Sequence, residues 1–402
     1  MNGSLSGLRV VECARHVAGP FAGKLLADLG AEVIKVEEPG RGDPCRHLEP
    51  FVDDLPGPDR SGLFLYLNTS KMGITLDLST ATGGQILRHL LEDADVLIED
   101  YAPGQTNEWG LGFTTLHREN PRLVVLSITP FGQTGPHCNY KGDNLIASHA
   151  GGVAHYTPTS LEDLSFPPLK AGGRQGDFLT GVIAATVVMI AIIQRQRSGI
   201  GSHVDLSRQE ALAYAVIRDM VAYAYAGTLT PRGGPMVAGI SGLLKCKNGY
   251  AHLHAREERL WPSLLEIMGN PDWAEDPRFA DVVARDEHWD ELWPHIQEWA
   301  AQQTKEEIAQ CAQERHIACA AVNSISEVVQ SPHLAAREFF LNVDHPVIGS
   351  ISMPSAPFKV EPGLWAVRRR APTLGEHNEE ILCGRMGYSL DDMARLAGAG
   401  II

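Results

Sequence analysis

The sequence lacks several patterns that would place it in a membrane or in an oxidising compartment. Its longest apolar run, about 16 residues at 178–193, is shorter than the roughly 20 residues that a membrane-spanning helix needs. Its seven cysteines are scattered without a C-x-x-C pair, and no secretory signal leads the sequence. We therefore expect a cytoplasmic protein with reduced cysteines and no membrane partner.

Positive charge is also scarce. The chain has 34 Lys and Arg residues against 49 Asp and Glu residues, which gives a net charge of −15. This balance argues against nucleic acid or an anionic membrane as the main partner. Any anionic ligand must therefore meet a local group of basic side chains. The length of 402 residues suits two domains, or one large α/β domain with an appendage.

Three signatures of common sites are missing. His252 and His254 share a strand face, but no cysteine or carboxylate is placed nearby to complete a metal site, so we expect no metal. The absence of a G-x-S-x-G elbow argues against a Ser-His-Asp hydrolase. The absence of a G-x-G-x-x-G fingerprint argues against an NAD-linked oxidoreductase.

Strand-like and helix-like segments alternate through the first half of the chain. This alternation predicts βαβ units, and hence an α/β fold with a Rossmann-like, doubly wound parallel sheet. Strands are expected at 8–12, 31–37, the end of 64–78, 95–99, 123–129 and 203–206, and helices at 20–29, 79–94, from 144 and from 177.

The second half has a different organisation. A Gly/Pro-rich stretch at 228–242 precedes an alternating segment at 250–254 and helical segments near 257–269, 288–302 and 304–314. We interpret this part as a smaller α+β domain. The expected boundaries are 1–207 with 345–402 for the large domain, 208–229 for an unbroken linker helix, 230–325 for the small domain and 326–344 for a return linker.

The stretch 174–207 organises the rest of our interpretation. It contains Gly176-Asp177, the long apolar run, a basic end and Gly199, which suits a helix C-cap. We expect a buried core helix with Asp177 as its N-cap or first residue. The aspartate can be a cap that accepts a backbone N–H, or a carboxylate nucleophile at the positive end of a helix dipole. The local sequence leaves both roles open.

Polar residues follow the second expected strand. Glu37 ends that strand, where a ribose could bind beyond the carboxyl ends of parallel strands, or where a solvated acidic residue could simply end the strand. Arg41 and Arg46 stand in the Gly/Pro-rich loop 39–46. Guanidinium groups match phosphate oxygens, although loop arginines are often only exposed.

Taken in order, many such motifs match one family. The sequence resembles the class III CoA-transferases, also called the CaiB/BaiF family, which are relatives of formyl-CoA:oxalate and carnitine CoA-transferase. The resemblance covers nearly the whole chain. The matching motifs are His16-Val17-Ala18-Gly19-Pro20, Lys35-Val36-Glu37, Gly42-Asp43-Pro44-x-Arg46, Asn68-x-x-Lys71, Asp95-Val96-x-x-Glu99, Pro103-Gly104, Phe131-Gly132-Gln133-x-Gly135-Pro136, Gly176-Asp177, Ser198-Gly199-x-Gly201, Val204-Asp205 and Leu374-Gly375-Glu376-His377.

The resemblance implies a reaction for Asp177. As the family nucleophile it would attack an acyl-CoA thioester, pass through a mixed anhydride and an aspartyl-CoA thioester, and return CoA to an acceptor acid. The substrates would be an acyl-CoA donor and a small carboxylic acid, with CoA as a substrate and no permanently bound cofactor.

The resemblance also implies CoA contacts. Glu38 and Glu108 depart from arginines of the oxalate enzyme, and a glycine loop that shields the intermediate would correspond to Gly239–Gly242. The implied CoA-binding residues are His16, Val17, Ala18, Arg46, Lys71, Asp100, Tyr101 and Lys141.

Two further expectations concern assembly and alternatives. The family forms dimers of interlocked rings, so the resemblance implies a homodimer, with a heteromer of two paralogues as an alternative in which this chain is a CoA-binding subunit. A 2-methylacyl-CoA racemase would share the fold. Racemases have a Gly-His-Asp step where this chain has Lys141-Gly142-Asp143, so their histidine base is missing.

Overall fold

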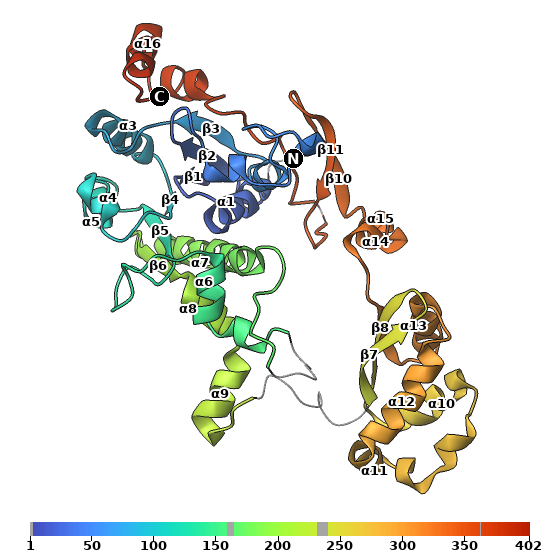
Figure 1. Cartoon of the computed structure of the whole chain (residues 1–402). Helices are drawn as coiled ribbons and strands as arrows, with labels where there is room; N and C mark the ends of the chain where they lie inside the picture. The colour runs from blue at the N-terminus through green and yellow to red at the C-terminus, as the bar shows by residue number, and fades with distance from the viewer. Residues whose placement is uncertain (1–2, 159–164, 231–239, 362) are drawn as a thin grey trace. The chain divides into compact units, whose positions relative to one another are not determined.

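The computed structural model describes residues 3–158, 165–230, 240–361 and 363–402. The chain divides into two compact units (Figure 1). The larger unit takes in Met1–Pro158, Pro167–Thr230 and Glu338–Ile402, and the smaller unit takes in Thr159–Phe166 and Pro231–Arg337.

A six-stranded parallel sheet forms the centre of the larger unit, in the order β3-β2-β1-β4-β5-β6. The order reverses between β1 and β4, and ligands of doubly wound sheets bind beyond the carboxyl ends of the strands at such a point. The strands are β1 (Arg9–Glu12), β2 (Glu32–Glu37), β3 (Met72–Thr75), β4 (Val96–Glu99), β5 (Val124–Thr129) and β6 (His203–Ser207).

Helices cover both faces of this sheet, which confirms the predicted α/β fold (Figure 1). One apolar core lies under α1 and α7, and the other lies under α3, α5 and the C-terminal segment. The helices are α1 (Ala18–Asp28), α2 (Gly62–Leu67), α3 (Ala81–Leu91), α4 (Gln105–Glu108), α5 (Phe113–Glu119), α6 (Asn144–Ala150), α7 (Gln175–Ser198), α8 (Arg208–Ala215), α9 (Ile217–Ala226) and α16 (Leu390–Gly398), with a π-helix at Glu379–Cys383.

Helix α7 is longer than the apolar run suggested. With 24 residues, this helix is long enough and apolar enough to cross a membrane, judged by length and composition alone. Ala184, Val188 and Ile192 instead pack into the core beneath the sheet, as expected of a core helix. Gly181 allows a close approach to α1, because a Cβ atom there would lie 2.8 Å from the carbonyl oxygen of Ala18.

The expectation of an unbroken helix at 208–229 was wrong. Val216 has φ −111° and ψ 29°, which is outside the helical region, and it separates α8 from α9. The β-branched side chain of Val216 favours extended backbone more than a helix, and α8 contains only eight residues.

The smaller unit contains a three-stranded antiparallel sheet in the order β7-β8-β9, covered by helices, which confirms the additional α+β region. Gly239 lies outside the described residues, and Gly242 is part of β7. The elements are β7 (Ile240–Cys246), β8 (Gly249–Ala255), α10 (Trp261–Met268), α11 (Val282–Glu287), α12 (Trp289–Ala300), α13 (Lys305–Glu314), β9 (Ala318–Ala321), α14 (Ile325–Val329) and α15 (Pro332–Ala336).

The segment 326–344, expected as a linker, contains most of α14, all of α15 and most of strand β10 (Phe340–His345). β10 pairs with β11 (Gly349–Pro354) in an antiparallel hairpin of the larger unit. The chain therefore returns to the larger unit through regular elements.

The close packing of α1 on α7 gives a first prediction. Gly181→Ala should destabilise the larger unit, because its new methyl group would meet main-chain atoms of α1 that move only with the helix. Such overpacking costs about 1–3 kcal/mol, and we expect a lower melting temperature. Gly398→Ala is the control, since a Cβ atom at this helical glycine of α16 would have nothing within 4 Å. Equal melting temperatures for wild type and Gly181→Ala would contradict this packing.

Candidate active site

Asp177 lies two or three residues further into its helix than the sequence suggested. Helix α7 begins at Gln175, so Asp177 is its third residue, and Arg174 occupies the N-cap position. The expectation that Asp177 is the cap or first residue was therefore wrong. In the described structure, the Asp177 carboxylate is partnered by the guanidinium groups of Arg174 and Arg208. It still lies in the first turn, where the helix dipole favours negative charge.

Two arginines hold this carboxylate. Arg208 Nη1 lies 3.3 Å from Asp177 Oδ1, and Arg174 Nη1 lies 3.6 Å from Oδ2. Asp177 is only 2% exposed and Arg208 is 9% exposed. Burial raises the pKa of the Asp177 carboxyl, while the two arginines and, to a lesser degree, the His16 ring oppose that rise. The arginines therefore favour an ionised carboxylate in a site that water barely reaches.

The glycine before Asp177 has a steric role. A Cβ atom on Gly176 would lie 2.5 Å from Asn144 Oδ1 and 3.1 Å from the methyl groups of Leu212. Asn144 is the first residue of α6, and its buried Oδ1 has no hydrogen-bond partner among the described residues. The Gly-Asp step thus lets α6, α7 and α8 meet closely around the carboxylate.

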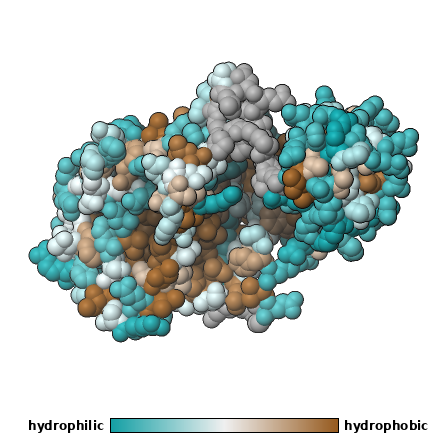
Figure 2. Space-filling model, turned by 90° about the horizontal axis from the view of Figure 1, so that it is seen from below, coloured by the Kyte–Doolittle hydropathy of each residue, from teal (hydrophilic) through white to brown (hydrophobic). Residues whose placement is uncertain are grey.

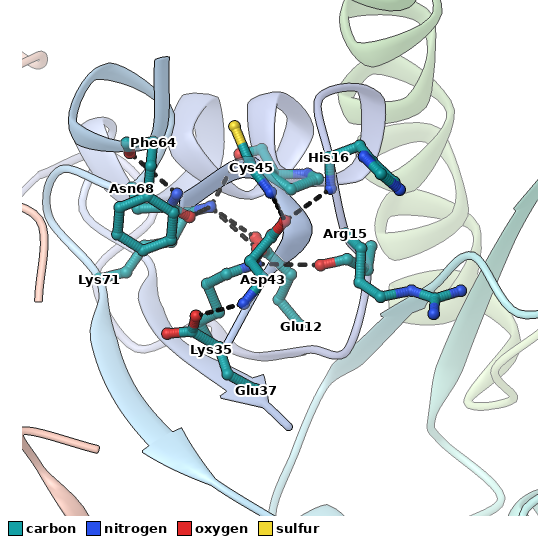
Figure 3. Close-up of polar contacts among 12 residues, drawn as sticks. Glu12, Arg15, His16, Lys35, Glu37, Asp43, Cys45, Phe64, Asn68 and Lys71 are labelled. Carbon is teal, nitrogen blue, oxygen red and sulfur yellow. Dashed lines mark hydrogen bonds and ion pairs between the residues drawn. The ribbon is translucent and has the colours of Figure 1, made fainter. Parts of the chain in front are cut away.

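The loop after β1 brings His16 towards this site. His16 has a left-handed backbone with φ 63°, and its N–H donates to Asp43 Oδ1 at 3.0 Å. The N–H of Cys45 donates to the same oxygen at 2.8 Å. Asp43 Oδ2 pairs with Lys35 Nζ at 2.8 Å (Figure 3). Asp43 therefore fixes the strained loop, and its pKa is lowered by Lys35 and these N–H donors although burial opposes the shift.

The predicted phosphate ligands Arg46 and Lys71 are both buried among charged side chains. Figure 3 shows Lys71 beside Glu12. Arg46 makes a two-pronged contact with Glu37 at 2.7 and 2.8 Å and stacks on Phe64. Lys71 Nζ lies 2.8 Å from Glu12 Oε2. Burial lowers the pKa of Lys71 to about 8, although Glu12 opposes this. Both side chains are fully buried, so direct phosphate contact, which stays a prediction, would require a rearrangement.

Glu37, considered above for a ribose, is also buried and is used by its neighbours. It accepts the Arg46 guanidinium and the N–H of Asp43 at 2.8 Å. These bonds join β2 to the following loop. In this geometry the glutamate is a structural partner of Arg46, and its contact with a ribose stays a prediction.

The remaining predicted contacts lie mostly at the point where the strand order reverses. Asp100 follows β4 and accepts both the N–H and the Nε of Arg15, at 3.0 and 3.2 Å. The Arg15 guanidinium lies 5.0 Å from the Tyr101 ring centroid. Val17 and Ala18 are fully buried, backbone included, so their contact with CoA stays a prediction and would require the loop to move.

Lys141 lies elsewhere, exposed in the loop before α6. The neighbouring Asp143 accepts the N–H groups of Leu145 and Ile146 and so caps α6. The Asp143 carboxylate stands where racemases have the aspartate of their Gly-His-Asp step. In this chain it is occupied by capping α6.

Sequence reasoning missed Arg174, Arg208 and Asn144 as members of the site. A signal for Arg208 was present, because it directly follows β6 at the carboxyl edge of the sheet. Among the residues that the structure describes, no group of three or more His, Cys, Asp or Glu side chains is placed to hold a metal ion.

Glu99 gives a prediction about pH. It is 3% exposed and accepts the N–H of Tyr101 at 2.7 Å. Burial raises the pKa of Glu99 to about 7, well above its value of about 4.3 in an unfolded chain. Between these values only the folded protein keeps the proton, so stability should fall as pH rises through this window.

Glu99→Gln should remove this loss, which amounts to at most roughly 4 kcal/mol. Thermal unfolding at pH 5 and at pH 8 measures the loss of stability. Glu99→Gln should lose less stability between pH 5 and pH 8 than wild type does. Glu38→Gln, at an exposed glutamate, is the control. The same pH dependence in Glu99→Gln and wild type would refute the assignment.

The comparisons with known proteins agree on one family. The family model of CoA-transferase family III matches residues 5–378 of this chain. A succinyl-CoA–D-citramalate CoA-transferase of Chloroflexus aurantiacus is 34% identical over 99% of this chain and 98% of its own. A formyl-CoA:oxalate CoA-transferase of Streptomyces avermitilis is 32% identical over the whole of both chains.

A subunit of another relative and two solved structures extend this picture. The BbsE subunit of succinyl-CoA:(R)-benzylsuccinate CoA-transferase from Thauera aromatica is 32% identical over 98% of both chains. A CaiB/BaiF family protein from Brucella suis has a TM-score of 0.85 at 29% identity, covering 96% of this chain and all of its own. Rv3272 from Mycobacterium tuberculosis has a TM-score of 0.80 at 28% identity, covering 94% and 98%. This chain therefore belongs to CoA-transferase family III, the CaiB/BaiF family.

Proposed function

We propose that this CoA-transferase moves CoA between carboxylic acids with Asp177 as the covalent carrier. The observation that carries this proposal is the Asp177 carboxylate itself. It is buried in the first turn of α7, is not used as a cap, and faces two guanidinium groups. A carboxylate of this kind suits acyl transfer, because the anhydride it forms is itself reactive and each step stays reversible.

The proposed first half of the reaction charges the enzyme. An Asp177 oxygen attacks the thioester carbonyl of the acyl-CoA donor, and the C–S bond breaks to release the CoA thiolate. The thiolate then attacks the aspartyl carbonyl of the mixed anhydride. The donor acid leaves as a carboxylate with the bridging oxygen, and an aspartyl-CoA thioester remains.

The second half repeats these steps with the acceptor. The acceptor carboxylate attacks the aspartyl carbonyl and displaces the thiolate, which forms a second anhydride. The thiolate attacks the acyl carbon that came from the acceptor, and Asp177 leaves as a free carboxylate. No proton is gained or lost over the cycle, so the mechanism needs no general acid.

Two features support CoA binding beyond β1 and β4. No side chain caps the first turn of α1 in the described structure, which leaves the N–H groups of Ala18 and Gly19 without a side-chain cap. Both residues are buried, so contact with an anion would require the loop before α1 to move. His16, Asp100 and Tyr101 surround this point of the sheet. We propose that Arg46 and Lys71 support the loops from inside the protein, and that Lys141 supplies an exposed positive charge near α6.

We also propose that two copies assemble, in keeping with the interlocked dimer that the resemblance implies. Figure 2 shows apolar residues gathered on the face of the larger unit that is turned to the viewer. Helices α7 and α9 leave large apolar side chains exposed, and the occupant that fits is a second copy. These side chains are Val182, Ile190, Ile193, Ile217, Met220 and Val221.

The assembly makes a third prediction. Light scattering after size exclusion should give a mass twice the 43.7 kDa of the chain. Ile190→Asp should lower it towards one chain, whereas Leu390→Asp, at an exposed leucine of α16, should not. A monomer that is fully active on its own would contradict the dimer. Activity only in the presence of a paralogue would instead favour a heteromer, and the relative BbsE is itself named as a subunit.

The nucleophile makes the fourth prediction. Asp177→Asn keeps the shape but removes the attacking oxygen anion, so transfer should fall at least about 1000-fold. Incubation with a panel of acyl-CoA thioesters and hydroxylamine should give one hydroxamate on the Asp177 peptide of wild type and none on the variant. Asp391→Asn, at an exposed carboxylate of α16, should behave as wild type.

Two outcomes would reject this mechanism. One is transfer that survives Asp177→Asn, and the other is a trapped adduct at another residue. Exchange of deuterium at the acyl α-carbon without transfer would instead support the racemase alternative, although Asp143 is engaged as a cap.

A further inference from the structure

The charge balance around Asp177 changes during the proposed reaction. The free carboxylate balances Arg208 and Arg174. The carboxylate becomes neutral when it forms an anhydride or a thioester. Both guanidinium groups stay charged, because arginine does not lose its proton in proteins. The acylated enzyme therefore has a buried positive charge without its partner.

Arg208 is affected most by this change. Its side chain is 11% exposed, against 37% for Arg174, so water can replace the lost partner at Arg174 far better. Asp177 is the single acidic partner of Arg208 among the described residues. The Nε of Arg208 is buried and has no hydrogen-bond partner there. A buried donor without a partner is costly, so Arg208 can bind an additional oxygen ligand.

The position of Arg208 suits the reacting acid. Its Nη1 lies 3.3 Å from an Asp177 oxygen, so a carboxylate bound to the fork would lie beside the aspartyl carbonyl. Arginine binds carboxylates through two parallel hydrogen bonds, which fixes their orientation. An acid held in this way is close to the atom that it must attack.

We propose that Arg208 determines how the acid substrate binds, by exchanging the Asp177 carboxylate for the carboxylate of that acid whenever Asp177 is acylated. The inference rests on the proposed function, because it requires Asp177 to become neutral in the cycle. The ligand class is a free carboxylate anion, which is the donor acid as it leaves and the acceptor acid as it enters. Arg174 contributes less because it faces solvent.

Substitution of Asp177 isolates this exchange from catalysis. Asp177→Asn has the shape of the aspartate but the neutral charge of the acylated state. Acetate is the probe because it is the smallest carboxylate with a methyl group, and acetamide is its uncharged control. Asp177→Asn should bind acetate at least tenfold more tightly than wild type in an NMR titration, with no change for acetamide.

Double variants assign the gain to one arginine. Asp177→Asn with Arg208→Gln should lose the gain, whereas Asp177→Asn with Arg174→Gln should keep most of it. If the Arg208→Gln form does not fold, Arg208→Lys replaces it and should retain only part of the gain, because lysine lacks the planar fork. No gain in Asp177→Asn, or a gain that persists without Arg208, would overturn the proposal.

Steady-state kinetics provide a second test in the enzyme with Asp177 intact. Arg208→Gln at pH 8 should raise the KM of the acid at least tenfold and leave the KM of the acyl-CoA within about twofold. A merely structural role would change both. An unchanged acid KM overturns the inference if the hydroxamate still forms on Asp177. If wild type forms no hydroxamate, the proposed function fails first.

Discussion

The contact between the Asp177 carboxylate and its two arginines is the interaction on which the rest of the site depends. Burial alone would favour a protonated carboxyl, which is a poor nucleophile. The guanidinium groups oppose this effect, and the first turn of α7 adds the positive end of a helix dipole. The close packing of α6, α7 and α8 requires glycine at 176, and it brings Arg208 to the carboxylate from a separate helix.

A second buried network holds the loop that carries His16. Glu12 of β1, Lys35 of β2, Asp43 of the following loop and Lys71 just before β3 form buried ion pairs. Removing one partner from such a network leaves an uncompensated buried charge. The network holds the His16 loop in its left-handed conformation through Asp43. The loop that we propose for CoA binding is therefore held by residues that do not reach the surface.

Much of the fold followed from the sequence, because a parallel sheet buries both faces and its strands read as short apolar runs between helical segments. Segments such as 95–99 and 123–129 were located within one or two residues of β4 and β5. Asp177 was identified as the nucleophile through the family resemblance, since its local sequence did not decide between a helix cap and a nucleophile. Helix boundaries were less certain, and the break at Val216 depends on a single residue.

Side-chain partners could not be predicted in the same way. Arg208 is 31 residues from Asp177, and the two meet only because β6 returns the chain to the edge of the sheet. Arg46 and Lys71 had the chemistry of phosphate ligands, but Glu37 and Glu12 hold them inside the protein. Whether a basic residue faces a ligand or a buried acid depends on tertiary packing, which spacing along the chain does not reveal.

Oxygen-isotope labelling tests the central claim most directly. In the proposed cycle the acceptor carboxylate gives its bridging oxygen to Asp177 when the second anhydride is opened by the CoA thiolate. Turnover with an acceptor acid labelled with ¹⁸O in its carboxylate should therefore place one ¹⁸O atom in the peptide that contains Asp177. An unlabelled Asp177 peptide, recovered while the labelled acyl-CoA product accumulates, would contradict the account.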